Sequence, residues 1–285
     1  MPRLSINGAR IYIEERGTGT PIVFLPGLAT GIRFFRPQFE ALSGDFRTVG
    51  LDYRGHGRSE TTEIGYTLEQ FAADIHAVLE ELSLEDVIMV GWSLGALLSW
   101  EYIDRYGADR IRGLVDVDME PSPYQRSDYE YGTYTVDSLR ESLIALQTDR
   151  FAALEEAMDR VCKDPPTGAL REMMLDEMSR CPPTVQGTLM LSLIRDYRPL
   201  GDRRAHARLC RRGRQMAPSG VGRTYRGLSL CRANRTIPRE WPLSHGRGAG
   251  PLQPRAQGVC GVRVGCSAKR LIGRHPWVGM DTHPQ

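Results

Sequence analysis

Hydrophobic and polar positions form two distinct patterns along the first part of the chain. Strands are predicted over residues 21–25, 46–52, 87–90 and 111–118. The runs at 21–25 and 87–90 are continuously apolar, which is typical of strands buried on both faces. Between them, residues 34–42 and 66–82 carry apolar side chains at helical spacing. This alternation predicts an α/β fold with a mostly parallel, doubly wound sheet covered by helices on both faces.

Local signals mark where some of these elements begin and end. Asn7-Gly8 separates two short alternating segments, which predicts a β-hairpin at the start of the chain. Thr67 and Gln70 have the spacing of a capping box at the start of the helix over 66–82. The predicted strands place Gly27, Ser93 and Asp118 at their carboxyl ends. In parallel sheets, ligands bind at these ends.

The pattern changes after Asp118. Residues 119–200 contain no strand-like run, and helical spacing recurs over 136–146, 150–162, 170–181 and 185–197. We expect a helical cap, inserted after a strand and lying over the site. Its methionines are expected to pack in the protein interior rather than to contact substrate: Met158, Met173, Met174, Met178 and Met190.

Residues 87–102 contain the most informative motif. An apolar strand leads into G-W-S-L-G over residues 91–95, and a helical segment follows. A tight turn between strand and helix leaves no room for side chains at Gly91 and Gly95, and it holds Ser93 in a strained conformation with its hydroxyl exposed. The start of the helix adds free N–H groups and a partial positive charge. The sequence therefore predicts a nucleophile beside an anion-stabilising site.

Charge is divided sharply along the chain. Residues 201–285 contain 16 Arg and one Lys against Asp202, Glu240 and Asp281, a net charge of +14, whereas residues 1–200 carry −12. The last 85 residues also lack any apolar period and are rich in Gly and Pro. We divide the chain into a core at 1–118, a cap at 119–200 and a tail at 201–285.

Several classes of protein are not indicated. The six cysteines have no C-x-x-C spacing, so neither a metal site nor a redox pair is expected. The first residues lead directly into a strand pattern, and no apolar run is long enough to cross a bilayer. We therefore expect a cytoplasmic protein without membrane or nucleic-acid partners, and its oligomeric state is left open.

Three motifs together resemble the α/β-hydrolase fold family. They are L-P-G-L at 25–28, D-Y-R-G-H-G-R-S at 52–59 and G-W-S-L-G at 91–95, in that order and at these spacings. The segment D-Y-R-P-L at 196–200 is similar to the point where the cap of such proteins returns to the sheet. The resemblance covers residues 1–200 and lies closest to serine esterases and cofactor-free haloperoxidases.

This resemblance implies roles for individual residues. Ser93 would be the nucleophile, and the backbone N–H groups of Leu28 and Leu94 would form the oxyanion hole. Many members have His-Gly before the first of these donors, where this chain has Pro26-Gly27, and backbone donation by Leu28 survives that change. His56 is expected to be structural, and His76 is expected to be solvated or packed.

The implied chemistry is hydrolysis of a small carboxylic ester through an acyl-enzyme, without a cofactor. Serine at position 93 excludes members that attack with aspartate. A cofactor-free haloperoxidase or perhydrolase remains open, and a carbon–carbon bond hydrolase is disfavoured because residues 25–28 lack a longer glycine run. A non-enzymatic alternative is that the basic tail binds anionic partners.

The resemblance fails where the catalytic acid and base are expected. In the family the acid and then the histidine follow the nucleophile, late in the chain. Only His206, His245, His275 and His283 follow residue 200, and none has a matching setting. His245 is the least unsuitable of these candidates for the base.

A shifted translation frame would explain the tail. Read one base later, permitted codons for residues 201–216 can encode a strand ending in a Gly-x-x-Asp turn. Permitted codons for residues 239–253 can likewise encode a histidine loop followed by a helix. We therefore hypothesise that residues from about Gly201 onward are a frameshifted remnant of the C-terminal part of the core.

Overall fold

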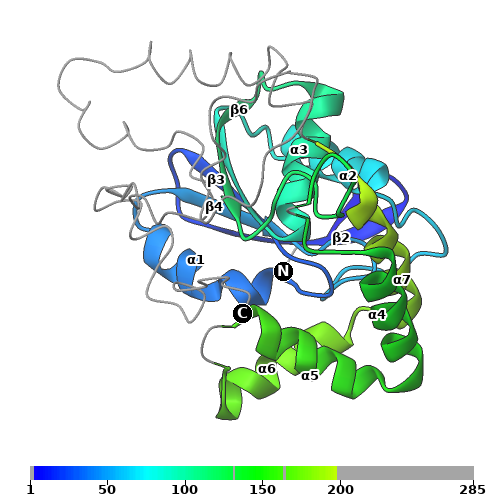
Figure 1. Ribbon diagram of the computed structural model, residues 1–285. Coiled ribbons are helices and arrows are strands. Elements are labelled where there is room, and N and C mark those ends of the chain that lie inside the picture. The colour runs from blue at the N-terminus through cyan, green and yellow to red at the C-terminus, as the bar shows by residue number, and fades with distance from the viewer. Residues whose placement is uncertain (1–2, 131, 163–164, 198–285) are drawn as a thin grey trace, which may run out of the picture.

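The computed structural model describes residues 3–130, 132–162 and 165–197 (Figure 1). These residues contain a six-stranded sheet in the order β1-β2-β4-β3-β5-β6. The strands are β1 (Arg3–Ile6), β2 (Ala9–Arg16), β3 (Pro21–Leu25), β4 (Arg47–Leu51), β5 (Val87–Trp92) and β6 (Ile111–Val117). β4, β3, β5 and β6 run parallel, and β2 pairs antiparallel with both β1 and β4. The predicted mostly parallel sheet is confirmed.

The hairpin at the start of the chain forms as predicted. Ile6 pairs with Ala9, and the two residues between them have positive φ, 46° at Asn7 and 77° at Gly8. A two-residue turn with φ above zero at both positions matches the twist of the flanking strands. The turn therefore sets the register of the sheet's first pair.

Alternate residues of the central strands face two separate apolar layers. On β3, Val23 and Leu25 point into a cluster with helices α2 (Leu68–Glu81) and α3 (Leu94–Tyr106). Ile22 and Phe24 point the other way, towards η1 (Ile32–Phe35) and α1 (Arg36–Leu42). All five residues of β3 are buried, as a continuous apolar run requires. Helices thus cover both faces, with α1 opposite α2 and α3 (Figure 1).

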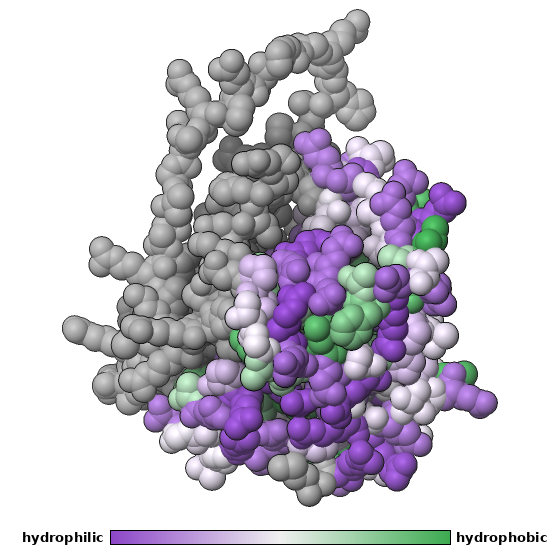
Figure 2. Space-filling model, turned by 90° about the horizontal axis from the view of Figure 1, so that it is seen from below, coloured by the Kyte–Doolittle hydropathy of each residue, from purple (hydrophilic) through white to green (hydrophobic). Residues whose placement is uncertain are grey.

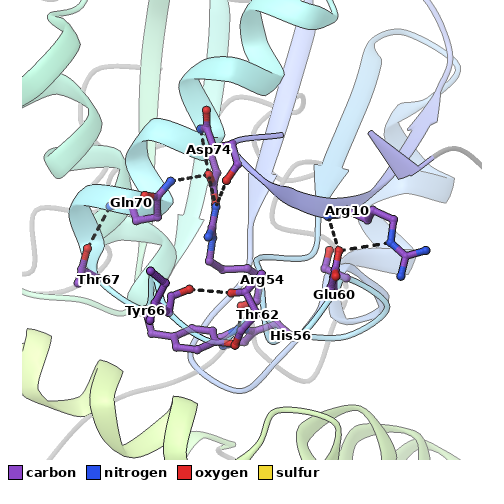
Figure 3. A network of polar contacts seen from close by, with 12 residues as sticks. Arg10, Arg54, His56, Glu60, Thr62, Tyr66, Thr67, Gln70 and Asp74 are labelled. Atoms are coloured by element: carbon purple, nitrogen blue, oxygen red, sulfur yellow. Dashed lines mark hydrogen bonds and ion pairs between the residues drawn. The ribbon is translucent and has the colours of Figure 1, made fainter. Parts of the chain in front are cut away.

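One predicted local contact is only half formed. Thr67 caps α2 by accepting from the backbone N–H of Gln70 at 3.1 Å. The Gln70 amide does not return the bond and instead donates to Asp74 at 3.0 Å (Figure 3). Asp74 also receives both arms of Arg54 at 2.7 and 2.8 Å in a buried ion pair. The Gln70 amide therefore serves as a further donor to Asp74, because a buried carboxylate needs several donors.

The segment after β6 is helical, as expected from its pattern. It contains α4 (Val136–Thr148), α5 (Arg150–Val161), α6 (Gly168–Ser179), α7 (Pro183–Met190) and η2 (Leu191–Ile194). Four of the five methionines are buried in apolar clusters, and Met173 is partly buried against one of them, which confirms the predicted packing. The buried four are Met158, Met174, Met178 and Met190. The surface seen from the side of α4 to α6 is mostly hydrophilic, with a small apolar area (Figure 2).

Contacts place α5 to α7 against the loops that follow the parallel strands. Met158 of α5 and Met174 of α6 share a cluster with Phe34 and Trp92, which follow β3 and end β5. A Cβ atom at Gly55, in the loop after β4, would lie 3.1 Å from Val185 of α7. The helices therefore lie at the carboxyl ends of the strands.

None of the helices in the described ranges is long and apolar enough to cross a membrane. The tail at 201–285, with its four cysteines and its suspected frameshift, lies outside the described residues. Cys162 and Cys181, which the structure does describe, are buried free thiols.

Candidate active site

Ser93 alone forms the bend between β5 and α3. The strand continues through Gly91 and Trp92, two residues beyond its predicted end, and the helix begins at Leu94. The backbone of Ser93 has φ 51° and ψ −114°, a conformation that L-residues rarely adopt. A single residue therefore reverses the chain and carries the strain of doing so.

The two glycines of the motif are required by close backbone contacts. A Cβ atom at Gly91 would lie 2.5 Å from the carbonyl group of Gly95. A Cβ atom at Gly95 would lie 2.0 Å from the carbonyl oxygen of Leu25 on the neighbouring strand. Both contacts are with backbone, which cannot move aside as a flexible side chain could, so the predicted steric reason for the glycines is confirmed.

Two backbone N–H groups beside the bend are without partners among the described residues. The first is that of Leu94, because the helix offers no acceptor to its first N–H groups. The second is that of Leu28, in the loop after β3. This loop is held by Thr30, whose N–H and hydroxyl both donate to the Gly27 carbonyl, at 3.2 and 2.9 Å. The sequence analysis names both N–H groups as oxyanion-hole donors, and that role stays a prediction.

Left-handed backbone gathers at this edge of the sheet. Ala29, Ser93 and Asp118 have φ of 59°, 51° and 53°, and they follow β3, β5 and β6. These three strands are neighbours in the sheet. Non-glycine residues in this region cost on the order of 1–3 kcal/mol each and tend to occur at functional sites. Strain at three adjacent strand ends marks this edge as the candidate site.

Two aromatic side chains stack next to the bend. Trp92 immediately precedes Ser93 and stacks on Phe34, with ring centroids 5.7 Å apart and an interplanar angle of 21°. A Cβ atom at Gly27 would lie 2.9 Å from the Trp92 ring, so only glycine lets the loop after β3 approach the indole. Both rings are buried in the apolar cluster on the α1 side of the sheet.

Asp118 is a site residue to which the sequence analysis assigned no role. It follows β6 directly, and the residue before it, Val117, pairs with Trp92 on β5. Burial and, less strongly, the charge of Glu120 raise the pKa of its carboxyl group above the usual value. No hydrogen bond to another described residue engages its carboxylate. The signal in the sequence is its position, one residue beyond an apolar strand, but its backbone conformation is visible only in the structure.

The two histidines in the described ranges are occupied elsewhere. His56 is buried, with Nδ1 3.1 Å from the Arg54 carbonyl oxygen and Nε2 3.7 Å from Cys181 Sγ. Burial lowers the pKa of His56 to about 4, so the ring is neutral at physiological pH. His76 stacks on Tyr106 at 4.0 Å. The expected structural role of His56 and packing of His76 are confirmed, and the candidate base His245 lies outside the described residues.

Other features of the described residues do not form a competing site. No group of three or more His, Cys, Asp or Glu side chains in these ranges could hold a metal ion. An open apolar groove of about 630 Å³ lies between α4 and η2, lined by residues such as Leu143 and Leu191. Its lining includes neither Ser93 nor any other residue at the strand ends.

Comparison with known proteins agrees with this geometry. Residues 20–175 match the family model described as alpha/beta hydrolase fold. The chain is 29% identical over 170 residues to the AB hydrolase superfamily protein YisY of Bacillus subtilis, covering 59% of this chain and 63% of that protein. The chain thus spans less than two thirds of that relative's length.

Solved structures with the same fold include an esterase and a haloperoxidase. The esterase from Exiguobacterium antarcticum has a TM-score of 0.65 and 25% identity, covering 68% of this chain and 74% of that one. A bromoperoxidase from Bacillus anthracis has a TM-score of 0.64 and 28% identity, covering 67% of this chain and 72% of that one.

Proposed function

This chain belongs to the alpha/beta hydrolase fold family, and we propose on that basis that it is a serine hydrolase acting on small carboxylic esters. One observation carries the proposal. Ser93 occupies a strained bend between a buried strand and a helix, beside two N–H groups without partners in the described part of the chain. The similarity to a solved esterase supports the same class of substrate.

In the proposed reaction, the Ser93 hydroxyl oxygen attacks the ester carbonyl carbon and its proton passes to a base. The carbonyl oxygen becomes an oxyanion that accepts from the Leu28 and Leu94 N–H groups, each contributing about 3 kcal/mol to transition-state stabilisation. Collapse expels the alcohol and leaves an acyl-enzyme. Water then attacks the acyl carbon, releases the acid and restores the Ser93 hydroxyl.

The base must be a group other than the two described histidines, because His56 and His76 are engaged elsewhere. We keep the histidines of residues 201–285 as candidates, with His245 named from the sequence. Asp118 would orient such a histidine by accepting from its second ring nitrogen. Its position at the end of the strand next to β5, and its carboxylate free of described partners, support this role.

The helices of residues 119–197 would act as the cap that selects the substrate. Their packing on the loops after β3, β4 and β5 supports this role, since a substrate at Ser93 would lie beneath them. Residues 1–118 would form the core that carries the nucleophile. A cytoplasmic location, the absence of a cofactor and the frameshift in residues 201–285 stay predictions.

Labelling with a fluorophosphonate, together with hydrolysis of short p-nitrophenyl esters, tests the proposal. We expect the probe to modify Ser93 and the Ser93→Ala variant to lose both labelling and ester hydrolysis. Ser99→Ala is a matched control, because Ser99 lies on the same helix with its hydroxyl bound to the Gly95 carbonyl at 3.0 Å. Equal activity in Ser93→Ala and wild type would exclude the assignment.

A second candidate is a cofactor-free perhydrolase, favoured by the similarity to a solved bromoperoxidase. Hydrogen peroxide would take the place of water, so that the acyl-enzyme releases a peracid, and the peracid would then oxidise halide. Peroxide-dependent bromination with acetate as co-substrate separates the two functions. Bromination that requires Ser93, without measurable ester hydrolysis, would favour the second.

A further inference from the structure

Two buried carboxyl groups, one on the core and one on α6, face the same small space. Asp52 follows β4 and Glu177 lies on α6, and both side chains are inaccessible to solvent. A Cβ atom at Gly31 would lie 2.8 Å from Asp52 Oδ1 and 2.1 Å from Glu177 Oε1. The absence of a side chain at Gly31 therefore leaves room for the two carboxyl oxygens to approach one another.

The donors around this pair do not satisfy it completely. Asp52 Oδ1 accepts from the Ile32 N–H at 2.7 Å and Oδ2 from the Arg58 N–H at 2.9 Å. Glu177 Oε2 pairs with Arg33 at 3.0 Å, but Glu177 Oε1 is buried without a hydrogen-bond partner. A charged oxygen without a donor is costly in the interior, whereas a protonated carboxyl group can donate to its neighbour.

Burial is the main cause that raises the pKa of Asp52, to about 7, and the charge of Glu177 raises it further. Two carboxylates that share a dry site hold a proton at a pH where isolated carboxyl groups have lost theirs. Once protonated, the Asp52 carboxyl group can donate to Glu177 Oε1, the buried acceptor that has no other partner.

We propose that a proton held by Asp52 and donated to Glu177 Oε1 forms a pH-sensitive latch that fastens α6 to the core. With the proton bound, the pair carries one negative charge, which Arg33 balances. When the proton leaves for solvent, two negative charges remain in a space closed to water, and α6 is held less tightly. The inference does not require Ser93 to be a nucleophile.

Other charged and titratable groups surround the pair. Arg33, Asp176 and Arg180 form ion pairs at the outer edge, with distances of 2.8 Å between Arg33 and Asp176 and 2.9 Å between Arg180 and Asp176. Arg33 and Arg180 lower the pKa of Asp176, so it stays ionised, and the Arg58 guanidinium donates to the Tyr12 hydroxyl at 2.6 Å. Burial raises the tyrosine pKa values of Tyr12 and Tyr53 and the thiol pKa of Cys181, and it lowers that of His56 to about 4.

The direction of the pH dependence follows from the raised pKa. A group that binds its proton more tightly in the docked state favours docking while it is protonated, and this contribution is lost as pH rises through about 7. We expect amide hydrogen exchange in α6, corrected for the intrinsic effect of pH, to accelerate about tenfold between pH 6 and pH 8.5. Exchange in α2, which lies away from the pair, should not change.

Variants of the full chain separate the latch from general effects of charge. Glu177→Gln keeps the shape and replaces the second carboxylate by an amide, whose N–H can donate to ionised Asp52. Docking of α6 then no longer needs the proton, so the pH dependence of exchange in α6 should become much weaker than in the wild type. Asp176→Asn is the matched control, because it alters the exposed partner of Arg33 on the same helix and should keep the wild-type pH dependence. The same pH dependence in Glu177→Gln and wild type would overturn the proposal.

Carbon-13 NMR of Asp and Glu carboxyl groups in the wild-type protein tests the proposal even if Glu177→Gln fails to fold. A carboxyl signal that titrates near pH 7, well above the midpoints of the exposed carboxyl groups, supports the latch. Titration of every carboxyl group below pH 5 would overturn it.

Discussion

The backbone N–H of Ser93 donates a hydrogen bond of 2.9 Å to the carbonyl oxygen of Val117. The last residue of β6 thus holds the residue that joins β5 to α3. This bond extends the pairing of the two strands by one step past Trp92, so the strained backbone of Ser93 is supported by its neighbour in the sheet. The candidate nucleophile is therefore positioned by the sheet rather than by a loop.

Gly95→Ala should destabilise the protein strongly, because the new Cβ atom would lie 2.0 Å from the Leu25 carbonyl oxygen. We expect a loss of about 2–4 kcal/mol in the free energy of unfolding, measured with urea. Gly44→Ala is the control, since no heavy atom lies within 4 Å of its added Cβ. Equal stability of the two variants would show that the turn has room for a side chain at position 95.

Ser93→Gly should remove activity and raise stability. Glycine adopts a φ of 51° without the steric cost that serine bears, so we expect a gain of about 1 kcal/mol in the free energy of unfolding. Ser83→Gly, at a φ of 50° in the turn after α2, should gain a similar amount and keep activity. A destabilised Ser93→Gly would contradict the idea that strain is concentrated at this residue.

Asp74→Ala should be among the more damaging changes away from the site. It would leave the Arg54 guanidinium buried without its carboxylate, at a cost of about 3–5 kcal/mol (Figure 3). Glu40→Ala breaks an exposed pair with Arg36 and should change stability by less than about 1 kcal/mol. Thermal unfolding of the two variants measures the contrast, and a small effect in Asp74→Ala would mean that solvent reaches Arg54.

His56 should remain neutral in mildly acidic solution. Its pKa is lowered to about 4 by burial, whereas an unfolded chain binds that proton near pH 6.5. The unfolded state therefore binds more protons in this window, and the contribution of His56 to stability is lost as pH falls from about 6.5 towards 4. Proton–nitrogen NMR of the imidazole should show one ring nitrogen unprotonated at pH 5.5. An imidazolium spectrum there would contradict the burial.

The tail makes a prediction about the gene. If residues from about Gly201 onward are frameshifted, resequencing should restore a strand with an acidic turn and a histidine loop. The intact mass of the protein isolated from its source would then differ from that of the printed sequence. A mass equal to the printed sequence would end the hypothesis and make His245 and the other tail histidines the candidates to test.

Local patterns were sufficient for most of the fold. Asn7-Gly8 specified the hairpin because its two positive φ angles are a property of the dipeptide itself. The apolar run at Val87 and the glycines at 91 and 95 likewise predicted the strand, the bend and the helix. The end of β5 was predicted two residues too early, because pairing with β6, rather than apolar composition, extends the strand to Trp92.

Long-range contacts decided what local patterns could not. The Gln70 side chain does not make its predicted contact with the Thr67 backbone. It donates instead to Asp74, one helical turn away, which forms a buried ion pair with Arg54. The sequence placed Asp118 at a strand end where ligands bind but gave it no role, and only the structure shows its left-handed backbone next to the pair formed by Trp92 and Val117.

By itself, the sequence determined the order of strands and helices, the bend at Ser93 and the glycines that permit it, because these depend on neighbours within a few residues. Only the tertiary structure decided that Asp52 and Glu177 face the same space beside Gly31. Their pairing joins residues 125 positions apart, and burial that changes a carboxyl group's proton affinity is a property of the packed interior, which no local pattern records.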